Sequence, residues 1–171
     1  VRLEAVRALA RVGTAQAAEL ALSVLERPMD PFLDYALWLT VNDLAEPWLA
    51  AVKAGAWSGQ GREKQLEFAL SAVETPIAGE VLGSLLGPGI IPEENAWIEL
   101  IGRAGGEAEL KRLYEHVAGG RFSEHGVARA LVALGEAARL RNLVPEASPQ
   151  ALQPLLSVSN ERIRLPAIQL T

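Results

Sequence analysis

The chain has 171 residues, of which 50% are hydrophobic and only 5% are aromatic, and its formal net charge is −5 at pH 7. The absence of cysteine excludes a disulfide framework, a thiol nucleophile and a cysteine-ligated metal or haem within this segment. The acidic balance argues against a nucleic-acid partner, and no apolar run reaches the ~18 residues that direct membrane insertion needs.

The first third of the chain predicts successive helices. Apolar side chains recur with a helical period over residues 3–10, which indicates an amphipathic helix that ends at Gly13. Thr14 is placed to cap the next helix. Asp30 is placed to cap a third, with Pro31 in the first turn, where its missing N–H costs nothing.

The same start signals recur along the rest of the chain. Asp43 and Glu46 form a possible capping box, and Glu93–Glu94 after Pro92 are expected in the first turn of a helix, near the positive end of its dipole. Residues 136–149 are predicted to be an insertion or a broken helix. The sequence indicates roughly eleven helical segments, with further starts at Thr75, Ser123, Ser148 and Ser159 or Asn160.

Alternate helices are expected to begin near Val1, Pro31, Arg62, Pro92 and Ser123, in steps of about 30 residues. The segment RALARVG at Arg7 is also similar to RALVALG at Arg129. A period of this length with two helices per repeat predicts an all-α fold, an α-solenoid of about five repeats. Since the chain begins and ends inside predicted helices, we expect it to be a fragment of a longer chain.

The segment VRLEAVRALARVG resembles the second helix of a HEAT repeat, especially the short bacterial type also found in phycobilin lyases. Asp30–Pro31 matches the turn that often precedes that helix. In motif the resemblance covers residues 1–13 and 123–135, and in rhythm it covers the whole chain. It implies a right-handed α-α superhelix and a single HEAT-like domain over residues 1–171.

The run ERPMDPFLDYALWLTVNDLAEPWLAAVKAG resembles a segment of large exported bacterial polypeptides. Those polypeptides join a sugar-dehydrogenase-like β-propeller to a HEAT array and a c-type haem domain. The resemblance implies an exported or periplasmic location and a role as a spacer between redox modules. Because the haem-attachment pattern Cys-x-x-Cys-His is absent, no redox residue and no cofactor is assigned to this chain.

Five aromatic residues lie early in the chain. Phe32, Tyr35 and Trp38 are three residues apart and share one helical stripe, for which burial is the first interpretation and a partner-binding patch the alternative. Trp57 lies in the glycine-rich loop AGAWSGQG. We expect it to be the aromatic side chain that is exposed.

No catalytic or metal-binding pattern stands out. His116 and His125 lack the spacing of a helical zinc site, and we expect both to be ordinary surface residues. The glycine clusters form no phosphate-binding loop. The segment 63–99 contains seven Glu and one Lys, whereas 121–164 contains six Arg and four Glu; this asymmetry is either a solvated face or a means of steering a partner.

The sequence therefore predicts a non-enzymatic scaffold that binds a protein partner or neighbouring domains of the same chain. The alternative is the structural part of an exported redox enzyme whose chemistry lies outside this segment. A nucleic-acid enzyme of HEAT-like fold is disfavoured by the acidic charge. The candidate partner-binding residues, placed on the second helices of the repeats and at the exposed tryptophan, are Asp34, Trp57, Glu67, Glu99 and Arg129.

Overall fold

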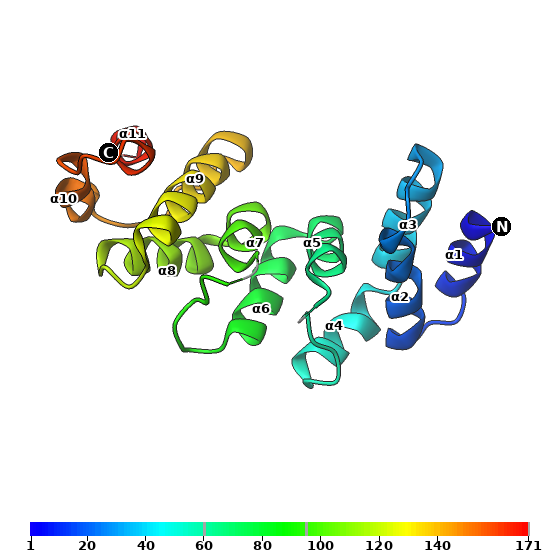
Figure 1. Ribbon diagram of the computed structural model, residues 1–171. Coiled ribbons are helices and arrows are strands. Elements are labelled where there is room, and N and C mark those ends of the chain that lie inside the picture. The colour runs from blue at the N-terminus through cyan, green and yellow to red at the C-terminus, as the bar shows by residue number, and fades with distance from the viewer. Residues whose placement is uncertain (60, 95, 171) are drawn as a thin grey trace. The chain divides into compact units, whose positions relative to one another are not determined.

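The computed structural model describes residues 1–59, 61–94 and 96–170, and every regular element among them is helical, which confirms the all-α prediction. The chain forms two compact units, Val1–Leu85 and Leu86–Thr171. Figure 1 shows the order of the helices along the chain. Each unit is described by itself below.

In the first unit, alternate helices lie side by side. It contains α1 (Arg2–Ala10), α2 (Ala15–Leu22), a short 3-10 helix η1 (Ser23–Glu26), α3 (Pro31–Asp43), α4 (Ala45–Lys53), α5 (Glu63–Ala72) and α6 (Thr75–Leu86), the last residue of which belongs to the second unit. Helix α1 packs on α3 and α3 packs on α5, while α2 packs on α4. The Thr40 hydroxyl of α3 donates to the Val6 carbonyl of α1 at 3.3 Å, inside the core.

The second unit repeats this arrangement of alternate helices. Its helices are α7 (Trp97–Ala104), α8 (Glu107–Ala118), α9 (Glu124–Arg141), the 3-10 helix η2 (Pro149–Leu152), α10 (Gln153–Leu156) and α11 (Glu161–Gln169). Helix α9 packs between α7 and α11, and α8 packs on α7, α9 and η2. The core of the unit is mainly aliphatic and includes Ile101, Leu113 and Leu131.

Several helix starts are capped as the sequence predicts. The Asp30 carboxylate accepts hydrogen bonds from the backbone N–H groups of Phe32 and Leu33 at 3.0 and 2.9 Å, with Pro31 as the first helical residue. Such bonds satisfy backbone donors that have no partner inside the helix. Three other predicted caps accept a bond from the helix that follows: Thr14, Ser123 and Asn160.

Two predicted helix starts are wrong. Asp43 ends α3 instead of capping α4, because α4 follows after Leu44 alone and Leu44 is its N-cap, without a side-chain bond. Helix α7 begins at Trp97, so Glu93 and Glu94 precede it in irregular structure. The Glu93 carboxylate instead accepts a hydrogen bond from the backbone N–H of Ser123 at 2.6 Å.

The predicted break at residues 136–149 falls later than expected. Helix α9 continues through Arg141 and ends at Asn142, which adopts the left-handed conformation with φ 54° and ψ 33°. The Arg141 guanidinium donates to the carbonyls of Gly102 and Gly105 at 3.0 and 2.7 Å. This last turn of α9 is therefore fastened to the end of α7.

Helices α7 and α9 approach each other closely at Gly102. A Cβ atom built on Gly102 would lie 2.7 Å from Ala133 Cβ and 2.9 Å from the Ala133 carbonyl oxygen. Gly135 lies on the same α9, yet nothing comes within 4 Å of a Cβ built there. Glycine is thus required at one position of this helix pair and dispensable at the other.

We predict that Gly102→Ala lowers the free energy of unfolding by about 1–3 kcal/mol, because the two backbones must separate. Gly135→Ala is the matched control and is expected to raise it by roughly 0.5–1 kcal/mol through helix propensity. Urea unfolding followed by circular dichroism measures both. Equal shifts for the two variants would contradict the close packing of α7 on α9.

Candidate interaction surface

The predicted partner-binding residues have different environments in the structure. Asp34 on α3 is exposed, while Glu67 on α5, Glu99 on α7 and Arg129 on α9 are half-buried. Of the five, Glu99 and Arg129 contact each other. Trp57 is buried.

The expectation that Trp57 is exposed is wrong, since only 5% of the residue is accessible. After α4 the chain turns back at Gly55, whose φ is 69°, and the backbone N–H of Trp57 donates to the Ala51 carbonyl at 3.3 Å. This turn places the indole edge-on against Trp48, with ring centroids 5.5 Å apart and planes at 71°. Trp57 therefore belongs to the core of the first unit and cannot anchor a partner.

The aromatic stripe of α3 has the opposite outcome. Phe32 is 78% exposed, Tyr35 63% and Trp38 42%, so burial, the first interpretation, is wrong. The core-facing positions of α3 are taken by Leu33, Ala36, Leu37, Thr40 and Val41. The aromatic side chains consequently lie on another face of the helix, where Tyr35 and Trp38 stack with centroids 6.3 Å apart.

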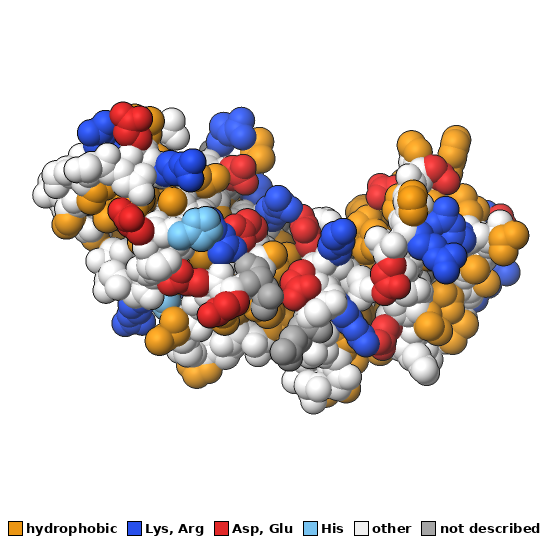
Figure 2. Space-filling model, in the orientation of Figure 1, with side chains coloured by type: hydrophobic (Ala, Val, Ile, Leu, Met, Phe, Trp, Pro, Cys, Tyr) orange, Lys and Arg blue, Asp and Glu red, His pale blue; other side chains and the backbone are white. Residues whose placement is uncertain are grey.

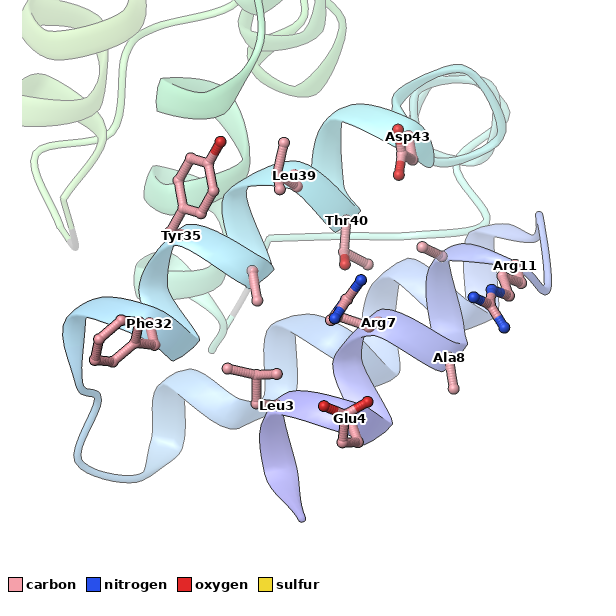
Figure 3. Close-up of a pocket in the computed structure, with 12 residues that line it drawn as sticks. Leu3, Glu4, Arg7, Ala8, Arg11, Phe32, Tyr35, Leu39, Thr40 and Asp43 are labelled. Atoms are coloured by element: carbon pink, nitrogen blue, oxygen red, sulfur yellow. The ribbon is translucent and has the colours of Figure 1, made fainter.

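A groove of about 650 Å³ runs between α1 and α3, and two residues of this stripe, Phe32 and Tyr35, line one wall of it (Figure 3). Phe32, Tyr35 and Leu39 recur at helical spacing, so that they share one side of α3. Leu39 is itself 41% exposed. We call this surface the α1–α3 groove, and its larger lining residues are Leu3, Glu4, Arg7, Arg11, Phe32, Tyr35, Leu39 and Asp43.

Two arginines line the groove, Arg7 and Arg11. Arg7 and Arg11 are exposed, and within the described residues neither guanidinium has a hydrogen bond or an ion pair. Arg2, by contrast, donates to the Pro28 carbonyl at 2.9 Å. In Figure 3 the Arg7 side chain points from α1 toward α3, and Figure 2 shows positively charged side chains over these helices with hydrophobic ones around them.

In the second unit the predicted residues Glu99 and Arg129 form an internal ion pair. Arg129 Nε and Nη2 donate to the two carboxylate oxygens of Glu99, each at 2.7 Å, and Nη1 donates to the Glu93 carbonyl at 2.7 Å. The hydrogen bonds from Arg129 lower the pKa of Glu99. The charged groups of both residues are therefore already used to fasten α7, and the segment before it, to α9.

This ion pair borders a second groove, of about 590 Å³, between α9 and α11. Val132 and Leu165 also line it and are 48% and 53% exposed. His125 lies at the same groove and is exposed, as predicted for a surface histidine.

His116 differs from the prediction, because it is only 3% exposed. Its Nε2 accepts a hydrogen bond from the Ile91 N–H at 3.2 Å, and its Nδ1 lies 2.9 Å from the Arg112 carbonyl. This pattern assigns the proton of the neutral ring to Nδ1. Burial of the imidazole lowers the pKa of His116. The residue thus holds the segment before α7 against α8.

No set of three or more His, Cys, Asp or Glu side chains suited to a metal ion occurs among the described residues. No helix in the described part of the chain has the length and apolarity to cross a membrane. No protein-family model, no curated protein and no solved structure matches this chain.

We predict that His116 makes stability depend on pH. Since its pKa in the folded protein lies below the ordinary value of 6.5, the unfolded chain binds the proton first. Stability is then complete well above pH 6.5 and declines as the pH falls through 6.5, until the imidazole of the folded protein binds a proton as well. Urea unfolding at several pH values measures this slope.

In the variant His116→Gln, the free energy of unfolding is expected not to depend on pH near 6.5. The variant His125→Gln is expected to keep the dependence of the wild type. Protonation of Glu99, whose pKa is lowered from 4.5, is expected to reduce the stability only at lower pH, and to do so in both variants. An unchanged slope in His116→Gln would show that another group titrates there.

Proposed function

We propose that the chain is a HEAT-like α-solenoid in which two-helix repeats stack in a right-handed superhelix. In support, hydrogen bonds join equivalent elements of neighbouring repeats. Those from Arg129 to Glu99 and from Ser123 to Glu93 each span 30 residues of sequence, which is the period that the sequence predicts. The packed helices α1 and α3 begin at Arg2 and Pro31, and the packed helices α7 and α9 begin at Trp97 and Glu124, which is close to the same period.

The function that these surfaces favour is non-catalytic binding of a polypeptide in the α1–α3 groove. The observation that carries this proposal is the exposure of Phe32, Tyr35 and Leu39 along one wall of a preformed groove. Aromatic side chains are preferred anchors of protein interfaces. A rigid helical surface also loses little conformational entropy when it binds.

The role as a spacer in an exported redox enzyme stays a prediction. It requires a propeller before Val1 and a Cys-x-x-Cys-His pattern beyond Thr171 in the full gene product. The sequence of the flanking regions tests it directly, and flanks that contain only more helical repeats would count against it.

We predict that the chain selects peptides from a random dodecapeptide phage library and that binding depends on the groove. The double variant Phe32→Ser/Tyr35→Ser removes the anchors and is expected to weaken the selected peptides at least ~10-fold, the effect of losing a typical hot spot. Fluorescence anisotropy with labelled synthetic peptides measures the affinities.

The control for this experiment is Leu140→Ser, which removes a side chain that is 68% exposed in the second unit. It is expected to leave the affinities unchanged. Because all three residues are exposed, circular dichroism should show the same helix content and stability in both variants as in the wild type. Peptides that bind both variants like the wild type would contradict the proposed function.

A further inference from the structure

We propose that the α1–α3 groove takes an acidic linear segment of a partner protein. In this complex two carboxylates bind Arg7 and Arg11, and an apolar side chain packs between Leu3 and Phe32. The inference rests on the proposed function and adds the chemistry of the ligand.

The two arginines supply the charge that such a segment would neutralise. Arg7 lies on α1 and Arg11 is the C-cap of that helix, about one helical turn later, so that like charges lie next to each other at some cost. Both are exposed and, within the described residues, neither is paired, although Glu4 and Asp43 line the same groove. Each guanidinium offers a planar fork of donors that matches a carboxylate.

The two ends of the groove differ in charge and hydrophobicity, so that a bound segment has one preferred orientation. In Figure 3, Leu3 and Phe32 lie toward one end, Arg7 lies between α1 and α3, and Arg11 and Asp43 lie toward the other end. A basic segment is attracted by Glu4 and Asp43 but repelled by Arg7 and Arg11, which line the same groove. A segment with an apolar residue first and acidic residues after it places each group beside its complement.

The carboxylates of Glu4 and Asp43 restrict this pattern further. Asp43 lies near the Arg11 end of the groove, so acidic residues that extend beyond Arg11 are disfavoured. The expected ligand is therefore one apolar or aromatic residue and two acidic residues about one helical turn apart, and not a uniformly acidic tail. Because the arginines are exposed, the affinity is expected to fall as salt is added.

The test repeats the dodecapeptide selection on the wild type and on Arg7→Glu. The wild type is expected to enrich peptides with paired Asp or Glu and one aromatic or Leu residue. The charge reversal is expected to replace the acidic residue that faces position 7 by Lys or Arg and to keep the acidic residue that binds Arg11. Synthetic wild-type-selected peptides should bind Arg7→Glu at least ~10-fold more weakly, as expected when a charge-assisted hydrogen bond is lost and replaced by repulsion.

The matched control is Arg27→Glu, the same charge change at an exposed arginine of the first unit that does not line the groove. It is expected to select the same acidic peptides with unchanged affinity. If Arg27→Glu weakens binding as much as Arg7→Glu does, the effect is one of overall charge and the proposal is overturned.

The remaining outcomes separate the inference from the function on which it rests. Peptides that depend on Phe32 and Tyr35 but not on Arg7 overturn the acidic ligand and leave the groove as a binding site. Peptides independent of Phe32 and Tyr35, or no enrichment at all, overturn both. Light scattering tests a further outcome. If the wild type is a dimer and Phe32→Ser/Tyr35→Ser is a monomer, the groove binds a second copy of the chain, and the acidic ligand is overturned.

Discussion

The packing of alternate helices on one another is the interaction on which the rest of the structure depends. No single helix of this length covers its own apolar face, and within each unit several helices are buried against the next helix but one. In the first unit α3 lies between α1 and α5, and in the second α9 lies between α7 and α11. At Gly102 and Ala133 the backbones of α7 and α9 approach so closely that a side chain on residue 102 would not fit. The same packing brings α1 beside α3 and so forms the groove to which we assign binding.

Three arginines of the second unit help to hold this packing together, whereas the two arginines of the α1–α3 groove do not. Arg112, Arg129 and Arg141 all donate to backbone carbonyls of the segments that flank or end α7, where irregular backbone has few helical partners. Such bonds replace the water that the carbonyls lose on folding. Arg7 and Arg11 donate no such hydrogen bond to the described residues. This contrast is why the α1–α3 groove, and not the ion pair of Glu99, is the stronger candidate for a partner.

The sequence predicts the helical content and most of the caps because these depend on local chemistry: Asp30 and Ser123 need only the backbone of the next turn. It does not predict which face of α3 is buried. Phe32 and Tyr35 fit a core as well as the aliphatic residues that occupy it, and the choice depends on the neighbouring helices. Likewise, the burial of Trp57 depends on a turn at Gly55 that folds the loop onto α4, where the indole packs against Trp48. Gly55 in AGAWSGQG favours a turn, but nothing in the segment indicates onto which helix the chain then folds.

The most direct test of this account is an NMR measurement of contacts between helices about 30 residues apart in sequence. At 18.3 kDa the chain is suited to isotope-edited nuclear Overhauser spectra. The account predicts cross-peaks from the Gly102 α-protons to the Ala133 methyl group, and from Val6 to Thr40. Spectra in which α1 and α3, or α7 and α9, show no mutual cross-peaks while each helix remains folded would contradict it.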